Sequence, residues 1–178
     1  MASMTDKAEQ RLGDDALPGE RVLYGVLAFR TGGVRKTMVA GATGVAGAAG
    51  AAMMAAATSL KGGGFPAAPL KVPGRMITVL TDRRLLVYSI GGAFAAKPGK
   101  LLHAFPLDRV VWLPEPELIP GAAQALRVQI GIAGEGVLGF EFPRLKVNEG
   151  RNMINRLRRE LPPEEEEPPE EAAEAAED

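Results

Sequence analysis

The sequence contains no cysteine and a single histidine, His103, in 178 residues. These absences exclude disulfides, a thiolate nucleophile and a cysteine zinc site, and they argue against a histidine metal centre or a Ser-His-Asp triad. We therefore expect no enzyme activity, cofactor or metal. No basic segment leads into an apolar run at the start, so we expect a cytoplasmic protein, with peripheral contact to the inner face of the membrane as a further option.

Basic residues are missing from the C-terminal segment. Residues 162–178 hold nine carboxylates and no Lys or Arg, so the first 161 residues carry 21 basic against 13 acidic residues. The body is cationic and the tail is anionic, which suits an anionic partner for the body. The alternative is that the tail only keeps a basic domain soluble. Residues 162–178 have no core-forming side chain and are predicted to be disordered.

Apolar, β-branched runs predict an antiparallel, β-rich domain over residues 17–161. Residues 77–90 place two such runs on either side of residues 81–84 (TDRR), which is typical of a tight β-hairpin formed by residues 75–81 and 84–90. Further strands are expected at residues 21–30, 100–105, 109–113, 124–132 and 137–142. Residues 1–16 are expected to be disordered or loosely helical. Residues 114–120 contain three prolines and predict an exposed loop.

One amphipathic helix is expected at residues 144–161. Its apolar stripe consists of Val147, Gly150, Ile154, Leu157 and Leu161, which recur at helical spacing. Two prolines at residues 162 and 163 end the helix. The stripe predicts that one face of this helix packs on the sheet.

An Ala/Gly-rich insertion interrupts the domain at residues 34–64. Residues 37–60 carry no charge and include ten Ala and four Gly, at Gly41, Gly44, Gly47 and Gly50. Glycines three residues apart let another backbone approach a helix, so we expect a helix that packs on the domain or on a second copy. A flexible insert and a membrane-spanning helix are the alternatives, but few residues in this segment favour insertion into a bilayer.

A second set of candidate residues is cationic and lies around the predicted turns. One interpretation is that such residues form a rim at the open end of the sheet that binds anions or lipids. The alternative is that they form a solvated rim without a ligand. The rim candidates are Arg75, Arg83, Arg84, Lys97, Lys100 and Arg109, and Arg30, Arg35 and Lys36 are further candidates for anion or lipid contact.

Other single residues have ordinary structural interpretations. Trp112 is expected to anchor the core, with a membrane-interface contact as the alternative. His103 is expected on a strand, and Glu141 should point away from its neighbours Phe140 and Phe142. Residues 32–37 (GGVRKT) lack the glycine that must precede the lysine of a phosphate-binding loop.

Three short motifs resemble the bacterial pleckstrin-homology-like (PH-like) domains. They are residues 18–23 (PGERVL), 80–85 (LTDRRL) and 106–110 (PLDRV). The resemblance covers residues 17–161 and implies a mainly β (α+β) fold, in which a bent antiparallel sheet or partly open barrel of about seven strands is capped by one C-terminal helix. The phosphoinositide pattern of the eukaryotic relatives is not matched, and Arg30, Arg35 and Lys36 are the nearest candidates.

These observations predict a non-enzymatic interaction or assembly module of unknown ligand. Protein–protein contact or self-association through residues 37–60 is the first hypothesis. The alternative is a peripheral binder of anionic membrane surfaces, in which the acidic tail competes for the cationic body. Nucleic acid is disfavoured because aromatic residues, on which bases stack, make up only 5% of the chain. No small-molecule substrate is evident.

Overall fold

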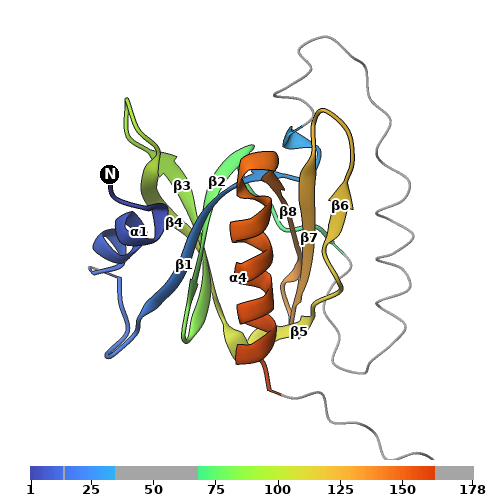
Figure 1. Cartoon of the computed structure of the whole chain (residues 1–178). Coiled ribbons are helices and arrows are strands. Elements are labelled where there is room, and N and C mark those ends of the chain that lie inside the picture. The colour runs from blue at the N-terminus through green and yellow to red at the C-terminus, as the bar shows by residue number, and fades with distance from the viewer. Residues whose placement is uncertain (14, 35–67, 163–178) are drawn as a thin grey trace, which may run out of the picture.

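The chain folds into one bent antiparallel sheet with a helix at either end of the sequence (Figure 1). The computed structural model describes residues 1–13, 15–34 and 68–162. Its elements are α1 (Met4–Leu12), β1 (Val22–Arg30), β2 (Arg75–Thr81), β3 (Arg84–Gly91), β4 (Lys97–Pro106), η1 (Leu107–Arg109), β5 (Val110–Trp112), β6 (Glu117–Ile119), β7 (Ala125–Ile132), β8 (Gly136–Pro143), η2 (Arg144–Lys146) and α4 (Val147–Glu160). The strands and the C-terminal helix that the sequence predicts are confirmed. β6 is an additional strand that the sequence analysis does not predict.

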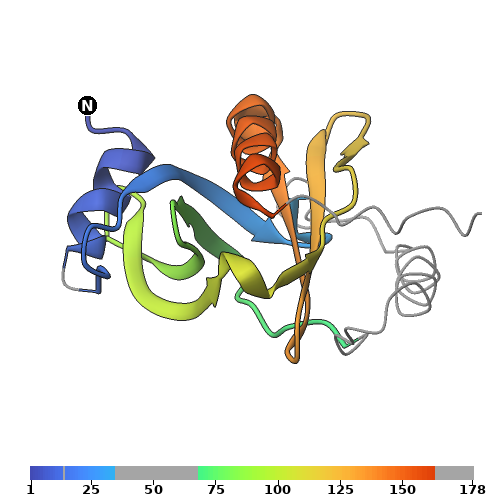
Figure 2. The same cartoon turned by 90° about the horizontal axis from the view of Figure 1, so that it is seen from below.

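Neighbouring strands run antiparallel in the order β4-β3-β2-β1-β8-β7-β5, and β6 also pairs with β7. The predicted hairpin is confirmed: Leu80 lies opposite Leu85 and Val79 opposite Leu86. The sheet curls, so that β1–β4 form one arm and β7 and β8 the other (Figure 2). This curvature encloses the main core.

Both faces of the β2–β3 hairpin are buried. Met76 and Leu80 of β2 point into the main core, which also holds Met153, Ile154 and Leu157 of α4. Ile77 and Val79 point to the other side of the sheet and pack with Ala8 and Leu12 of α1. A strand that is covered on both faces has an almost continuous apolar sequence, which explains the unbroken run in β2.

Of the two expectations for residues 1–16, disordered or loosely helical, the structure shows a helix, α1, at Met4–Leu12. Ser3 and Asp6 form a capping box that satisfies backbone N–H groups at the start of the helix. The helix lies close to β1 because Gly25 has no side chain: a Cβ atom there would stand 2.8 Å from the Met4 carbonyl oxygen. Burial of Ala8 and Leu12 then stabilises a helix too short to form alone.

The C-terminal helix α4 packs across β1, β7 and β8 (Figures 1 and 2). Its buried residues are Gly150, Met153, Ile154 and Leu157, in agreement with the predicted stripe. Gly150 lies directly against the ring of Phe142, which leaves no room for a Cβ atom. Gly150 therefore sets how closely the helix approaches the sheet.

Two further expectations need correction. Residues 114–120 are not simply a loop, because Glu117–Ile119 form β6 and pair with residues 125–127 of β7. The prolines at residues 114, 116 and 120 flank these three residues, which retain the N–H groups that a strand needs. Trp112 is not a core anchor: it is only half-buried and lines a surface groove.

The predictions for residues 35–67 and 163–178 lie outside the described residues. They include the helical Ala/Gly insertion, the self-association stripe at Gly41, Gly44, Gly47 and Gly50, and the disordered acidic tail. In the described part of the chain, no helix is both long enough and apolar enough to cross a membrane.

Replacing Gly150 tests the packing of α4. Gly150→Ala is expected to lower the free energy of unfolding by about 2 kcal/mol, because the added methyl group displaces the buried Phe142 ring. This loss should outweigh the gain of about 1 kcal/mol in helix propensity. Urea unfolding followed by circular dichroism measures the change. Asn152→Ala, on the exposed face of the same helix, is the matched control; a Gly150→Ala variant as stable as this control would contradict the packing.

Candidate functional site

The sheet has two ends with different chemistry (Figure 1). One end, here called the Phe94 end, contains the C-terminus of β1, the start of β2, the β3–β4 turn, the β6–β7 turn and the start of α4. In Figure 1 the β3–β4 turn, the β6–β7 turn and the start of α4 all face the top of the view. The opposite end, here called the Glu20 end, contains the β2–β3 turn and the C-terminus of α4.

The Phe94 end presents two large apolar side chains to solvent. Phe94, in the β3–β4 turn, is fully exposed, and Leu145, at the start of the C-terminal helix, is 91% exposed. Gly92 has a φ of 87°, and a side chain there would collide with the Ala95 carbonyl group, so the tight turn that presents Phe94 depends on glycine. These two side chains have no role in the core.

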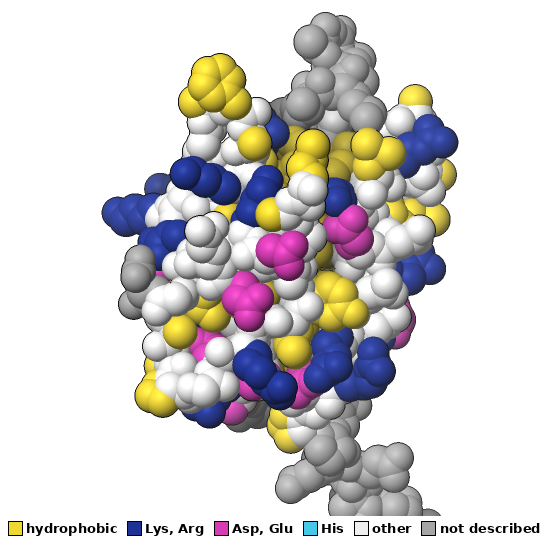
Figure 3. Space-filling model, turned by 60° about the vertical axis from the view of Figure 1, so that its left-hand side comes forward, with side chains coloured by type: hydrophobic (Ala, Val, Ile, Leu, Met, Phe, Trp, Pro, Cys, Tyr) yellow, Lys and Arg dark blue, Asp and Glu magenta, His cyan; other side chains and the backbone are white. Residues whose placement is uncertain are grey.

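The same end is strongly cationic. Its described residues, 30–34, 75, 91–97, 120–124 and 143–149, include five cations and one carboxylate. The cations are Arg30, Arg75, Lys97, Arg144 and Lys146. The carboxylate, Glu149, pairs with Lys146 at 2.7 Å. The Phe94 end thus combines an excess of positive charge with exposed apolar groups, and Figure 3 shows hydrophobic side chains projecting at the top of the molecule with Lys and Arg side chains below them.

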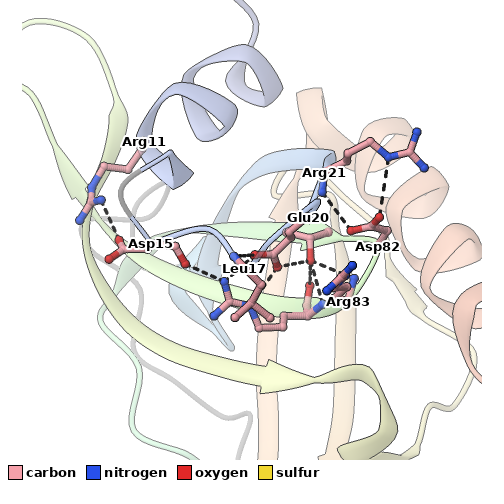
Figure 4. Close-up of polar contacts among 9 residues, drawn as sticks. Arg11, Asp15, Leu17, Glu20, Arg21, Asp82 and Arg83 are labelled. Carbon is pink, nitrogen blue, oxygen red and sulfur yellow. Dashed lines mark hydrogen bonds and ion pairs between the residues drawn. The ribbon is translucent and has the colours of Figure 1, made fainter.

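The Glu20 end is organised by a buried ion pair (Figure 4). The Glu20 side chain is fully buried, and its carboxylate accepts hydrogen bonds from the Arg84 guanidinium at 2.7 and 2.9 Å. It also accepts from the Thr81 hydroxyl at 2.7 Å and from the Leu17 N–H at 2.8 Å. The Asp15 carbonyl accepts a further bond from Arg84. These contacts fasten the segment before β1 to the β2–β3 turn.

The hydrogen bonds around Glu20 have an electrostatic consequence. Burial alone would raise the pKa of Glu20, but the bonds from Arg84, Leu17 and Thr81 favour the ionised form and lower the pKa to about 2. In return, the hydrogen bond to Glu20 raises the pKa of Arg84. The Arg84 cation is therefore bound within the fold, and a ligand would have to compete with Glu20 for it.

The structure divides the predicted cationic rim between the two ends of the sheet. Arg30, Arg75 and Lys97 lie at the Phe94 end, with the exposed Lys100 a few residues along β4. Arg83, Arg84 and Arg109 lie at the Glu20 end, as the bond from the Leu107 N–H to the Arg83 carbonyl indicates. Arg35 and Lys36 lie outside the described residues. A single rim containing the whole set is therefore corrected to two separate groups.

The remaining residues that the sequence analysis considered have structural partners. Glu141 is buried and accepts hydrogen bonds from Arg127 at 2.9 and 3.1 Å. The His103 ring lies 2.9 Å from the Lys71 carbonyl oxygen through Nε2 and stacks on Phe105. Within residues 1–13, 15–34 and 68–162, no group of three or more His, Asp or Glu side chains is arranged to hold a metal ion.

The sequence analysis missed Phe94 and Leu145. Phe94 is the only aromatic residue in the predicted turn of residues 91–100, and its neighbours are Gly and Ala, which cannot cover it. Leu145 lies between Arg144 and Lys146 and falls outside the apolar stripe of the helix. The available signal was an apolar residue that breaks the local pattern: an aromatic residue in a Gly/Ala turn at Phe94, and a leucine between two cations at Leu145.

Comparisons with known proteins give one similar solved structure. No family model matches the sequence, and no curated protein matches it. Among solved structures, the chain is similar to a pleckstrin homology domain from Shewanella amazonensis SB2B, at 14% sequence identity and a TM-score of 0.44. The similarity covers 86% of this chain and 96% of that chain. The coordinates themselves show a bent antiparallel sheet closed by a C-terminal helix, so the PH-like fold that the sequence motifs imply is confirmed.

The Glu20–Arg84 pair should make stability depend on acid pH. Glu20→Gln is expected to lower the free energy of unfolding at neutral pH by about 3 kcal/mol, because Arg84 loses its buried counter-charge. Since folding lowers the pKa of Glu20 from 4.5 to about 2, the stabilisation is complete above pH 4.5 and is lost as the pH falls towards 2. Urea unfolding of both proteins across this range measures the difference.

The control for this prediction is Glu160→Gln, which removes a more exposed ion pair with Arg156. This substitution should lower the free energy of unfolding by about 0.5 kcal/mol. The difference in the free energy of unfolding between wild type and Glu20→Gln should shrink as the pH falls. A difference that stays constant from neutral pH to pH 2 would contradict the role assigned to the Glu20 carboxylate.

Proposed function

We propose that this chain is a non-enzymatic binding module that docks on anionic membrane surfaces through its Phe94 end. The observation that carries the proposal is the combination of exposed Phe94 and Leu145 with five cations and a single carboxylate. An interfacial protein needs both elements, because cations attract anionic headgroups and apolar side chains enter the acyl boundary.

The cations supply the long-range part of the interaction. A Lys or Arg close to an anionic leaflet contributes about 1 kcal/mol, and this contribution falls off within a Debye length. Arg30, Arg75, Lys97 and Arg144 are exposed, so each can approach headgroups without breaking the core. Binding through these residues should weaken as salt increases.

The apolar side chains supply the short-range part. Transfer of an exposed Phe or Leu side chain out of water is favourable by about 2 kcal/mol when the side chain is fully buried. The β3–β4 turn and the start of α4, which carry or adjoin these residues, both face the top of Figure 1. Neither side chain has to leave the core to reach a surface on that side.

A lipid surface suits this end better than nucleic acid does. Stacking on bases needs several aromatic side chains along a groove, and Phe94 is the only aromatic among the described residues of this end. Self-association through residues 37–60 stays a prediction. It concerns a segment outside the described residues.

Vesicle binding tests the proposal. Wild-type protein should bind vesicles that contain phosphatidylserine and should bind much more weakly to phosphatidylcholine alone. The double variant Arg75→Gln/Lys97→Gln should reduce this binding roughly tenfold or more, since two headgroup contacts are lost. Phe94→Ala should reduce it by a similar factor, and the reduction should persist at higher salt because it is not electrostatic. Co-sedimentation measures the partition coefficient.

The matched control is Arg83→Gln/Arg109→Gln, which removes the same charge from the exposed surface of the Glu20 end. It should change binding far less than Arg75→Gln/Lys97→Gln does. Equal losses from the two double variants would show that only net charge matters and would reject the proposed face. Absence of wild-type binding to phosphatidylserine vesicles at low salt would reject membrane docking altogether.

A further inference from the structure

The acidic segment, residues 162–178, begins where α4 ends, at the Glu20 end of the molecule (Figure 1). It carries nine carboxylates and no Lys or Arg. Residues 163–178 lie outside the described part of the chain, but the point from which they start is fixed by α4. Negative charge held this close to the body is attracted to the part of its surface that has an excess of cations.

The Glu20 end has no excess of positive charge. Six cations and seven carboxylates lie among its described residues, which are residues 15–21, 82–84, 107–116, 133–136 and 158–162. Three of these cations are in ion pairs: Arg84–Glu20, Arg21–Asp82 and Arg158–Glu115. The acidic segment therefore gains little from the end at which it begins, because carboxylates already balance the cations there.

The Phe94 end has the complementary charge. Its described residues include five cations and one carboxylate, and that carboxylate pairs with Lys146. Among residues 1–13, 15–34 and 68–162, no carboxylate pairs with the other four cations, which are Arg30, Arg75, Lys97 and Arg144. The Arg75 guanidinium instead lies over the Phe29 ring, 5.7 Å from its centroid. These cations are available to carboxylates from elsewhere in the chain.

The length of the chain determines which carboxylates can reach that end. α4 has 14 residues, so its two ends are about 21 Å apart at a rise of about 1.5 Å per residue. An extended chain spans at most about 3.6 Å per residue, so residue 167 lies at most about 18 Å from Pro162, whereas residue 170 can reach about 29 Å and residue 178 about 58 Å. The four carboxylates of residues 164–167 therefore stay short of the Phe94 end, and the five of residues 170–178 can reach it.

We propose that residues 170–178 dock on the Phe94 end of the same chain and compete there with anionic lipid. The proposal rests on the proposed function, because it assigns a regulation to the same face. A carboxylate of the acidic segment takes the position that a headgroup phosphate or carboxylate takes on the membrane, beside one of the four unpaired cations. Because the segment is tethered, its local concentration is on the order of millimolar, so individually weak contacts are enough to hold it.

The positions of the strands and of α4 make this competition specific. Charge alone predicts that the acidic segment attracts the cationic body as a whole. The unequal charge of the two ends limits the contact to the Phe94 end, and the length of α4 limits it to five of the nine carboxylates. Two parts of one acidic segment should therefore differ in their effect on membrane binding.

Two variants of the full chain with the same net charge test this difference. The distal variant is Glu170→Gln/Glu171→Gln/Glu174→Gln/Glu177→Gln, and the proximal variant is Glu164→Gln/Glu165→Gln/Glu166→Gln/Glu167→Gln. The distal variant should bind phosphatidylserine vesicles about tenfold more tightly than wild type, as expected if the segment covers the face for about nine-tenths of the time. The proximal variant should gain far less. Co-sedimentation measures both, and equal gains would reduce the effect to net charge and overturn the assigned contact.

A measurement without membranes tests the contact itself. The chain has no cysteine, so Asp178→Cys creates a single attachment site for a nitroxide spin label. In NMR spectra the label should broaden the amide signals of residues 93–95 and 144–146 more than those of residues 82–84, which lie at the Glu20 end. The four distal substitutions should remove this difference. Stronger broadening at residues 82–84 would contradict the docking, and broadening that disappears on dilution would assign the contact to a second copy and contradict it as well.

Failure of this regulation can be told apart from failure of membrane docking. If wild type and both variants bind vesicles equally, membrane docking stands and only the regulation by residues 170–178 is overturned. If none of the three proteins binds vesicles, membrane docking fails and the competition with lipid fails with it, whatever the spin label shows. Thermal unfolding checks that the variants are folded.

Discussion

The fold depends on one constraint: the β2–β3 hairpin is apolar on both faces, so water must be excluded from both. Curvature of the sheet and α4 cover the inner face, where Met76 and Leu80 lie. The outer face, with Ile77 and Val79, requires a second cover, and α1 supplies it. Each large apolar side chain removed from water stabilises the fold by about 1.5–3 kcal/mol, and this gain offsets the cost of ordering a short N-terminal helix.

Charged side chains have different surroundings at the two ends of the sheet. At the Glu20 end, cations are tied to carboxylates and carbonyl groups, as in the Glu20–Arg84 and Arg158–Glu115 pairs. At the Phe94 end, Arg30, Arg75 and Lys97 are exposed, and the Arg75 guanidinium lies over the ring of Phe29. Most polar atoms in the described interior are satisfied, and the Tyr88 hydroxyl is the buried group there that lacks a hydrogen-bond partner. Structural polar contacts are thus concentrated away from the proposed docking face.

The sequence was sufficient where one residue pattern determines one local structure. The TDRR turn between apolar runs predicted the β2–β3 hairpin, and the stripe from Val147 to Leu157 predicted α4. It was insufficient where distant segments meet. The sequence left residues 1–16 open between disorder and a loose helix because the apolar residues of α1, Met4, Ala8 and Leu12, are few, although Gly25 in an apolar strand indicated close approach of another backbone. The division of the cations between two ends depends on strand register, which the hairpin alone does not determine.

The position of α1 has a consequence for biosynthesis. The helix is synthesised before the side chains that bury Ala8 and Leu12, because these include Ile77, Leu86 and Tyr88. A helix of nine residues is marginal in water without its tertiary contacts. Residues 4–12 can therefore form a stable helix only once the β2–β3 hairpin exists to cover its apolar side chains.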